Sequence, residues 1–142
     1  MLLVVDSNVV AKWFFPEELQ QQALALQSDW MTKTVDLVAP DLILTEVSNI
    51  TWKKQRLNLI TPTEALGIIE DLLLLSIPTV ESQNFLRQAY SLASRFDRTV
   101  YDALYLALAA FMQAKLVTAD LRLYNTVSSQ LEFVQYLGNY EK

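Results

Sequence analysis

A chain of 142 residues accommodates one compact domain, and we expect residues 1–142 to form a single one. Hydrophobic residues make up 52% of it, which excludes an intrinsically disordered protein, and the absence of cysteine and histidine excludes disulfides, zinc sites and catalysis by a thiol or a serine–histidine pair. The net charge of −5 counts against a nucleic acid as the partner, although acids gathered around divalent cations would be neutralised and could form part of such a site.

The first half of the chain begins with a buried strand. Residues Leu2–Val5 are apolar without alternation, as expected for a strand covered on both faces. A helix is predicted next over residues 17–30, where acids in the first turn suit the helix dipole. Residues 36–39 form a second strand, which Pro40 closes. A helix over residues 41–57 follows, and its inner face carries Ile43, Val47 and Ile50.

The second half opens with the clearest local signal in the sequence. Thr61 can cap a helix, Pro62 suits its first position and Glu64 can complete a capping box, so a helix is predicted that runs to Leu75. One later helix is apolar on nearly every side, which places it inside the fold. The later elements, in chain order, are a strand at 77–80, a helix at 82–95, the apolar helix from Thr99 to Met112, a strand at 116–118, a helix at 121–128 and a strand at 132–134.

No segment has the pattern of a signal peptide or a membrane span. The longest later apolar run, residues 103–112, is about half the length that a bilayer requires. The missing cysteines fit a reducing compartment. We therefore expect a soluble, cytoplasmic protein without a membrane partner.

Two acids follow strands whose carboxyl ends a parallel sheet would place at one edge. Asp6 comes directly after the first strand, and Asp120 comes just after the strand at residues 116–118. Ligands of parallel α/β sheets bind beyond the carboxyl ends of the strands, so the two carboxylates could face one another. Either residue could equally cap the turn or helix that follows it.

Asp102 lies at the start of the most apolar helix. An unpaired carboxylate there would be costly, so it needs a partner or a metal ion. The stretch from Thr99 to Asp102 also has the pattern of a capping box. Both roles are compatible, because a carboxylate has two oxygens.

Glu46 lies early in the helix predicted over residues 41–57 and shares a face with Asn49 and Lys53 at helical spacing. A solvated helix face is the ordinary interpretation of this pattern, and metal ligation is the alternative. Lys53, Lys54 and Arg56 could contact a phosphate backbone, or they could simply form a charged helix end.

Together these acids suggest a metal site more strongly than any one of them does alone. Mg²⁺ and Mn²⁺ prefer carboxylate oxygens, and two such ions can activate water and stabilise the leaving oxygen of a phosphodiester. Ser7, Thr118 and Asn49 adjoin acids and could orient a carboxylate or a ligating water. The predicted catalytic and metal-binding residues are Asp6, Glu46, Asp102 and Asp120.

Several motifs run nearly from end to end of the chain. They are residues 4–9 (VVDSNV), 12–13 (KW), 39–42 (APDL), 45–49 (TEVSN), 52–53 (WK), 99–109 (TVYDALYLALA) and 116–120 (LVTAD). In order and spacing, the chain resembles the PIN-domain family and, within it, the VapC-like toxins of bacterial and archaeal toxin–antitoxin pairs. The most specific of these motifs is the stretch at residues 99–109.

The resemblance implies an α/β fold, a three-layer α/β/α sandwich with a mainly parallel central sheet and the active site at its carboxyl edge. It implies an endoribonuclease that cleaves RNA with water activated by one or two Mg²⁺ or Mn²⁺ ions. The family acids map onto Asp6, Glu46, Asp102 and Asp120, with Ser7 as a polar support and Thr118 as another. It also implies a toxin that forms a homodimer and is held inactive by a cognate antitoxin occluding its active site.

Two stretches bear on the resemblance in other ways. The aromatic residues Trp13, Phe14 and Phe15 could belong to an interface with a partner or to the core. Many relatives carry a glycine shortly before the strand that leads to the last acid, where this chain has residues 113–115 (QAK). That departure concerns the turn from helix to strand and leaves the acids unaffected.

Other functions fit the sequence less well. A PIN nuclease of RNA processing or decay would share every catalytic residue, and the short chain favours the toxin. A PIN domain that only binds would lack acids that are present here. A response-regulator receiver would need an acidic pair near the first strand and a lysine after the last. A haloacid-dehalogenase-like phosphatase would need an aspartate at position 8, which is Asn8.

Overall fold

The computed structural model describes residues 1–141 and contains a five-stranded sheet in which all neighbouring strands are parallel. The strands are β1 (Leu2–Val5), β2 (Asp36–Pro40), β3 (Thr79–Val80), β4 (Lys115–Thr118) and β5 (Val134–Tyr136). Their order is β3-β2-β1-β4-β5. The strand order therefore reverses between β1 and β4, and ligands of parallel sheets bind at such a switch point.

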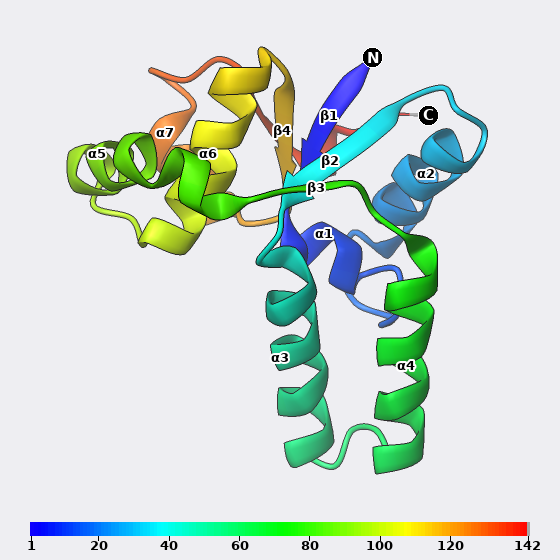
Figure 1. Ribbon diagram of the computed structural model, residues 1–142. Helices are drawn as coiled ribbons and strands as arrows, with labels where there is room; N and C mark the ends of the chain where they lie inside the picture. Colours follow the sequence, from blue (N-terminus) through cyan, green and yellow to red (C-terminus); the bar gives the residue numbers. More distant parts are fainter. Residues whose placement is uncertain (142) are drawn as a thin grey trace.

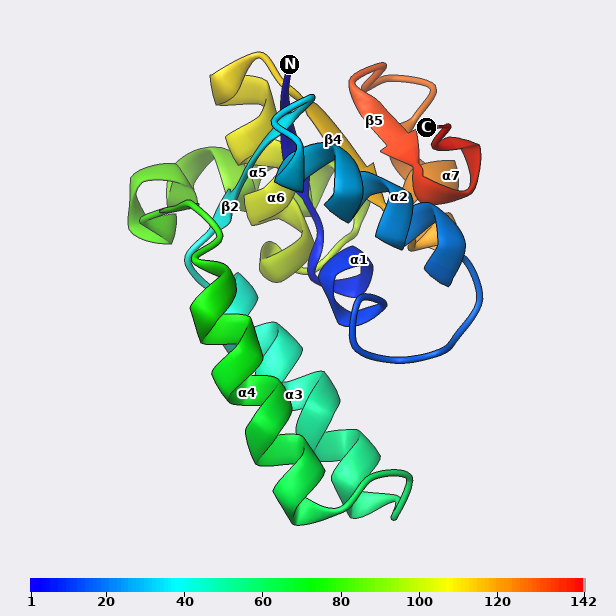
Figure 2. The same ribbon diagram turned by 90° about the vertical axis from the view of Figure 1, so that its right-hand side faces the viewer.

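Helices cover both faces of this sheet. They are α1 (Ser7–Ala11), α2 (Gln20–Met31), α3 (Ile43–Arg56), α4 (Pro62–Leu75), α5 (Leu86–Phe96), α6 (Val100–Met112) and α7 (Leu121–Val127), with 3-10 turns η1 (Ser82–Phe85) and η2 (Leu137–Asn139). The α5 and α6 helices lie on one face and α2 lies on the other, while α3 and α4 form a hairpin that projects from the carboxyl edge (Figures 1 and 2). This arrangement confirms the predicted three-layer α/β/α sandwich.

The α6 helix forms the centre of the core. Residues 103–109 are all buried, because α6 packs on β1, β2 and β4 and is covered by α5. A helix enclosed in this way has no solvent-exposed face over most of its length, which explains its apolar sequence. Among residues 1–141, no helix is both long and apolar enough to cross a bilayer.

Several predicted boundaries are wrong. The α2 helix begins at Gln20, because Glu17 instead binds Lys12 and Lys54, at 3.4 and 3.0 Å, and Leu19 has a left-handed backbone with φ of 65°. The short α1 was not predicted. The β3 strand is shorter than predicted, and β5 begins two residues later than predicted, at Val134.

The buried residues of α3 differ from the predicted row, and burial decides the role of the aromatic run at residues 13–15. On α3 the buried row is Ile43, Val47 and Thr51, and Ile50 is only partly buried. The Thr51 hydroxyl donates to the Val47 carbonyl at 2.9 Å, which satisfies it inside the core. Trp13 and Phe15 are buried, so this aromatic run contributes to the core of the chain.

Candidate active site

All four predicted acids lie where elements begin at the carboxyl edge of the sheet. Asp6 caps α1, because its Oδ1 accepts a hydrogen bond from the Ser7 backbone amide at 2.8 Å. Asp120 caps α7 in the same way, through the Leu123 amide at 3.0 Å. The other two acids lie in the first turns of helices, Glu46 in α3 and Asp102 in α6.

The capping interpretation of Asp6 and Asp120 is therefore correct but incomplete. Each residue uses Oδ1 for its helix and directs Oδ2 to other partners. The Oδ2 of Asp6 accepts from Thr118 at 2.7 Å, and the Oδ2 of Asp120 accepts from Arg98 at 3.4 Å. One oxygen builds the local structure and the other belongs to the site.

Thr118 links the carboxyl ends of β1 and β4. Its hydroxyl is fully buried, donates to Asp6 and accepts from the Asp120 backbone amide at 3.0 Å. Asn8 adds a second link, because its side-chain amide donates to Asp6 Oδ2 at 3.3 Å and its carbonyl accepts from the Ala119 amide at 3.0 Å. The Asp6 carboxylate is thus held in one orientation by groups from both sides of the switch point.

Burial raises the pKa of Asp6 to about 7. Only 5% of the residue is exposed. The hydrogen bonds from Thr118 and Ser7 lower the pKa, while the negative charges of Asp102 and Glu46 raise it further. Three of the predicted acids therefore interact electrostatically, and Asp6 is the most desolvated of them.

Glu46 is oriented by a tyrosine from the core helix. The Tyr105 hydroxyl donates to Glu46 Oε1 at 2.6 Å, and Tyr105 is only 1% exposed. Burial raises the pKa of Glu46, and the charge of Asp102 adds to this effect. The pKa of Tyr105 is also raised, by burial and then by the charges of Asp6 and Glu46, so its phenol stays protonated and remains a donor.

Asp102 is more than a helix cap. Its backbone amide donates to Thr99 Oγ1 at 3.1 Å, which forms one half of the predicted capping box. Its carboxylate does not complete the box. Instead, Asp102 Oδ2 accepts from Nε and Nη2 of Arg98, at 3.2 and 2.9 Å. The carboxylate thus faces the other acids and not the start of its own helix.

The donor set fits a hard divalent cation. Carboxylates are the ligands that Mg²⁺ and Mn²⁺ prefer, and the raised pKa values of Asp6 and Glu46 indicate desolvated, mutually repelling charges that a cation would stabilise. As they stand, no three acidic side chains among residues 1–141 are arranged tightly enough to enclose an ion. Of the four predicted ligands, Asp6, Glu46 and Asp102 are the residues that would hold one, because both carboxylate oxygens of Asp120 already accept hydrogen bonds from Leu123 and Arg98.

The remaining predicted residues lie around this cluster or away from it. Ser7 is buried beside Asp6, and Asn49 lies next to Glu46 in a hollow of about 390 Å³ that Thr45 and Tyr101 also line. The three basic residues lie two turns or more further along α3. Lys53 is exposed, Lys54 binds Glu17 and lies over the Phe15 ring, and Arg56 lies over the Trp52 ring.

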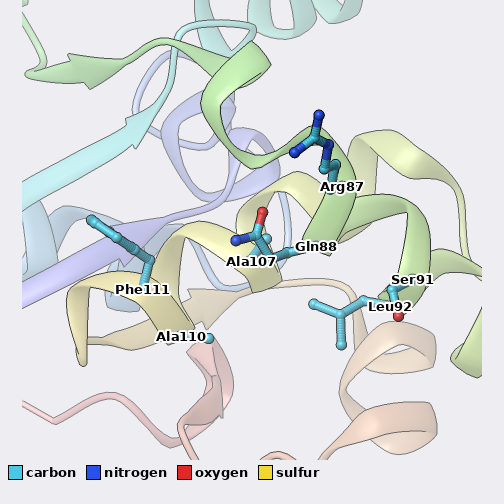
Figure 3. Close-up of a pocket in the computed structure, with 7 residues that line it drawn as sticks. All are labelled: Arg87, Gln88, Ser91, Leu92, Ala107, Ala110 and Phe111. Carbon is cyan, nitrogen blue, oxygen red and sulfur yellow. The ribbon is translucent and has the colours of Figure 1, made fainter.

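A larger hollow of about 670 Å³ lies elsewhere, between α5 and α6 (Figure 3). Its walls are formed by Arg87, Gln88, Ser91, Leu92, Ala107, Ala110 and Phe111. No acid lines it, so it cannot supply the carboxylate chemistry of the candidate site. The size of a hollow therefore does not lead to the predicted acids on this molecule.

The family model of the PIN domain matches residues 3–128, a span that contains all four acids. The chain belongs to the PIN-domain family. It is 35% identical over 125 residues to Ribonuclease VapC3 of Pyrobaculum aerophilum, covering 87% of this chain and 92% of that protein. Its fold is similar to that in the crystal structure of VapBC2 from Rickettsia felis bound to a DNA fragment from their promoter, with a TM-score of 0.62 and 12% identity over 96% of this chain and 98% of that chain.

Three residues of this PIN domain contact the acids but were not predicted from the sequence. Asn8 was considered only as a missing aspartate, and Tyr105 was taken as part of an apolar helix. The spacing of Asp102 and Tyr105, three residues apart on one helix face, is a signal that could have identified the tyrosine. Arg98 precedes Asp102 by four residues, a spacing that could have identified that pair, whereas its second partner Asp120 is 22 residues away in the sequence.

Proposed function

We propose that this PIN domain is an endoribonuclease that depends on Mg²⁺ or Mn²⁺ and acts as the toxin of a VapBC-like toxin–antitoxin pair. One observation carries the proposal. A buried carboxylate with a pKa raised to about 7, Asp6, lies beside Glu46 and Asp102 at the switch point of the sheet. The similarity to Ribonuclease VapC3 supports RNA as the substrate and the toxin role.

The residues around the acids have distinct tasks in such a reaction. A divalent ion held by Asp6, Glu46 and Asp102 would activate water and stabilise charge on the scissile phosphate. Thr118 and Asn8 keep Asp6 in its ligating orientation. Tyr105 fixes one oxygen of Glu46 and leaves the other directed away from that bond.

The proposal includes partners and a location in the cell. We infer a cognate antitoxin that occludes the active site, a homodimer and a cytoplasmic location. The competing role is that of a PIN nuclease in RNA processing or decay, which would use the same acids. A small antitoxin reading frame beside the gene, and co-purification of its product with this chain, would favour the toxin.

Cleavage of structured RNAs by the purified protein, freed of any partner, tests the function. We expect cleavage with Mg²⁺ or Mn²⁺, none with EDTA, and a loss of at least about a hundredfold in Asp6→Asn and Asp102→Asn. Asp97→Asn is the matched control. Asp97 is exposed, and its φ of 54° is one that asparagine tolerates, so this variant removes the same charge and should retain activity.

Circular dichroism establishes that each variant is folded before its activity is compared. Cleavage by wild type in EDTA would contradict the role of the metal. Equal cleavage by wild type and folded Asp102→Asn would contradict the role of the carboxylate cluster. A wild type that binds RNA without cleaving it would support the alternative of a binding PIN domain.

A further inference from the structure

Arg98 is held over the candidate site by the short connection between α5 and α6. Asp97 ends α5 with a left-handed backbone and Thr99 caps α6, so Arg98 lies between two fixed points. Its own backbone amide donates to the Ala93 carbonyl at 3.1 Å. Its side chain is only 21% exposed. The guanidinium therefore has a defined position rather than that of a free surface arginine.

The guanidinium bridges two of the four acids. Its Nη2 atom lies 2.9 Å from Asp102 Oδ2 and 3.4 Å from Asp120 Oδ2, and its Nε donates to the same Asp102 oxygen. The other oxygen of Asp120 already accepts from the Leu123 amide. Both oxygens of Asp120 and one of Asp102 are thus occupied by donors of the chain itself.

The other side of the cluster contains no cation within residues 1–141. Asp6 accepts only neutral donors, from Ser7, Asn8 and Thr118, and Glu46 accepts from the Tyr105 phenol. Arg98 therefore divides the cluster into a neutralised half at Asp120 and an uncompensated half at Asp6 and Glu46. Asp102 borders both halves.

We propose that Arg98 takes the place of a second cation, so that this PIN domain binds one divalent ion and not two. The proposal rests on the proposed function and concerns only the number of ions. When all four acids are ionised they carry four negative charges, of which one divalent ion and one guanidinium neutralise three. A second ion could use Asp120 only by displacing the charge-assisted hydrogen bonds of Arg98.

Isothermal titration calorimetry of the metal-free protein with Mn²⁺ alone tests the number of bound ions without reference to activity. We expect one Mn²⁺ per wild-type chain. We expect Arg98→Gln to bind two, with the second at least about tenfold tighter than any second binding to wild type. If circular dichroism finds Arg98→Gln unfolded, Arg98→Lys replaces it, because lysine lacks the fork that reaches both acids. A measurable second Mn²⁺ is then expected.

Two further variants separate this mechanism from a general effect of charge. Arg95→Gln removes the same charge near the end of α5, but Arg95 donates to Gln130 and contacts none of the acids. It should still bind one Mn²⁺. Arg98→Gln frees the Asp120 carboxylate to bind a second ion, and adding Asp120→Asn removes that carboxylate. The double variant should therefore bind one Mn²⁺ per chain.

The outcomes distinguish the inference from the function on which it rests. Two Mn²⁺ ions in wild type, one in folded Arg98→Gln, or two in Arg95→Gln would each overturn the role of Arg98 and leave the nuclease proposal intact. A failure of wild type and of every variant to bind Mn²⁺ would overturn both.

Discussion

At Asp6, burial and hydrogen bonding act in opposite directions on the same carboxyl group. Burial dominates, so the pKa rises to about 7 although Thr118 and Ser7 both donate to the charged form. In the absence of a cation the folded protein therefore retains a proton that the unfolded chain would release at a lower pH. This difference makes stability depend on pH.

We predict that the metal-free protein is less stable at pH 8 than at pH 5.5. A carboxyl with a folded pKa above its unfolded value of 3.8 stabilises the fold fully below that value, and the contribution is lost as the pH rises to about 7. The raised pKa of Glu46 acts in the same direction. The chain has no histidine, so no imidazole titrates in this range. Thermal melting in EDTA measures the effect.

Asp6→Asn is the control for that measurement, since it removes the main titrating group and should flatten the pH dependence. An equal or higher melting temperature for wild type at pH 8 would show that Asp6 is not held protonated in the metal-free fold.

Tyr105 allows a test of whether the orientation of the Glu46 carboxylate matters for cleavage. Tyr105→Phe keeps the buried ring but removes the hydroxyl that donates to Glu46. We predict a drop of about tenfold or more in RNA cleavage with the circular dichroism spectrum unchanged. Tyr90→Phe, at an exposed position of α5, should cleave like wild type. Full activity of Tyr105→Phe would mean that Glu46 needs no such support.

Among the elements, two helices begin with a threonine cap but differ in how the cap is completed. Thr61 and Glu64 form a full capping box at α4, at the far end of the hairpin. Thr99 forms half of one at α6, because the Asp102 carboxylate binds Arg98 instead. The same local motif is purely structural in one helix and borders the candidate site in the other.

We predict that Thr61→Ala and Thr99→Ala each lower the free energy of unfolding by about 1 kcal/mol, the usual contribution of such a cap. Only Thr99→Ala should also weaken cleavage, because it releases the turn that carries Asp102. Urea denaturation and the RNA assay, applied to both variants, compare the two effects. Equal cleavage activity of the two variants would show that the Thr99 cap of α6 does not contribute to the position of Asp102 in the site.

The length and the local sequence signals of each element explain which elements could be predicted. An amphipathic run identified α3, a wholly apolar run identified α6 and a capping box identified α4, while buried apolar runs identified β1 and β4. The α1 helix is five residues long and depends on its cap at Asp6, so it has no periodic signal. The position of β5 depends on its pairing with β4, which local sequence does not encode.

Within the site, the acids were predictable and their partners were not. Asp6 and Asp120 stand directly beyond strands, and Asp102 stands in an apolar stretch, so each is conspicuous in the sequence. Arg98 and Asn8 each contact one acid that is near in the sequence, but their contacts with Asp120 and Ala119 cross the fold, as does the contact of Tyr105 with Glu46. Only the tertiary structure brings these more distant partners together.

For the molecule as a whole, the parallel sheet brings distant parts of the chain to one point. The adjacent strands β1 and β4 end directly before Asp6 and two residues before Asp120, while α3 and α6 bring Glu46 and Asp102 to the same edge. We propose that residues 1–142 unfold as a single domain. The central claim is that this assembly hydrolyses RNA with a divalent ion.

The chemical nature of the product ends tests that claim most directly. Hydrolysis by activated water needs no attack by the RNA 2′-hydroxyl, and the chain has no histidine to promote such an attack. We predict linear phosphate ends by mass spectrometry with Mn²⁺, and cleavage of a substrate that lacks the 2′-hydroxyl at the cut position. Neither should occur in EDTA or with Asp102→Asn. Products ending in a 2′,3′-cyclic phosphate, formed without metal, would contradict the account.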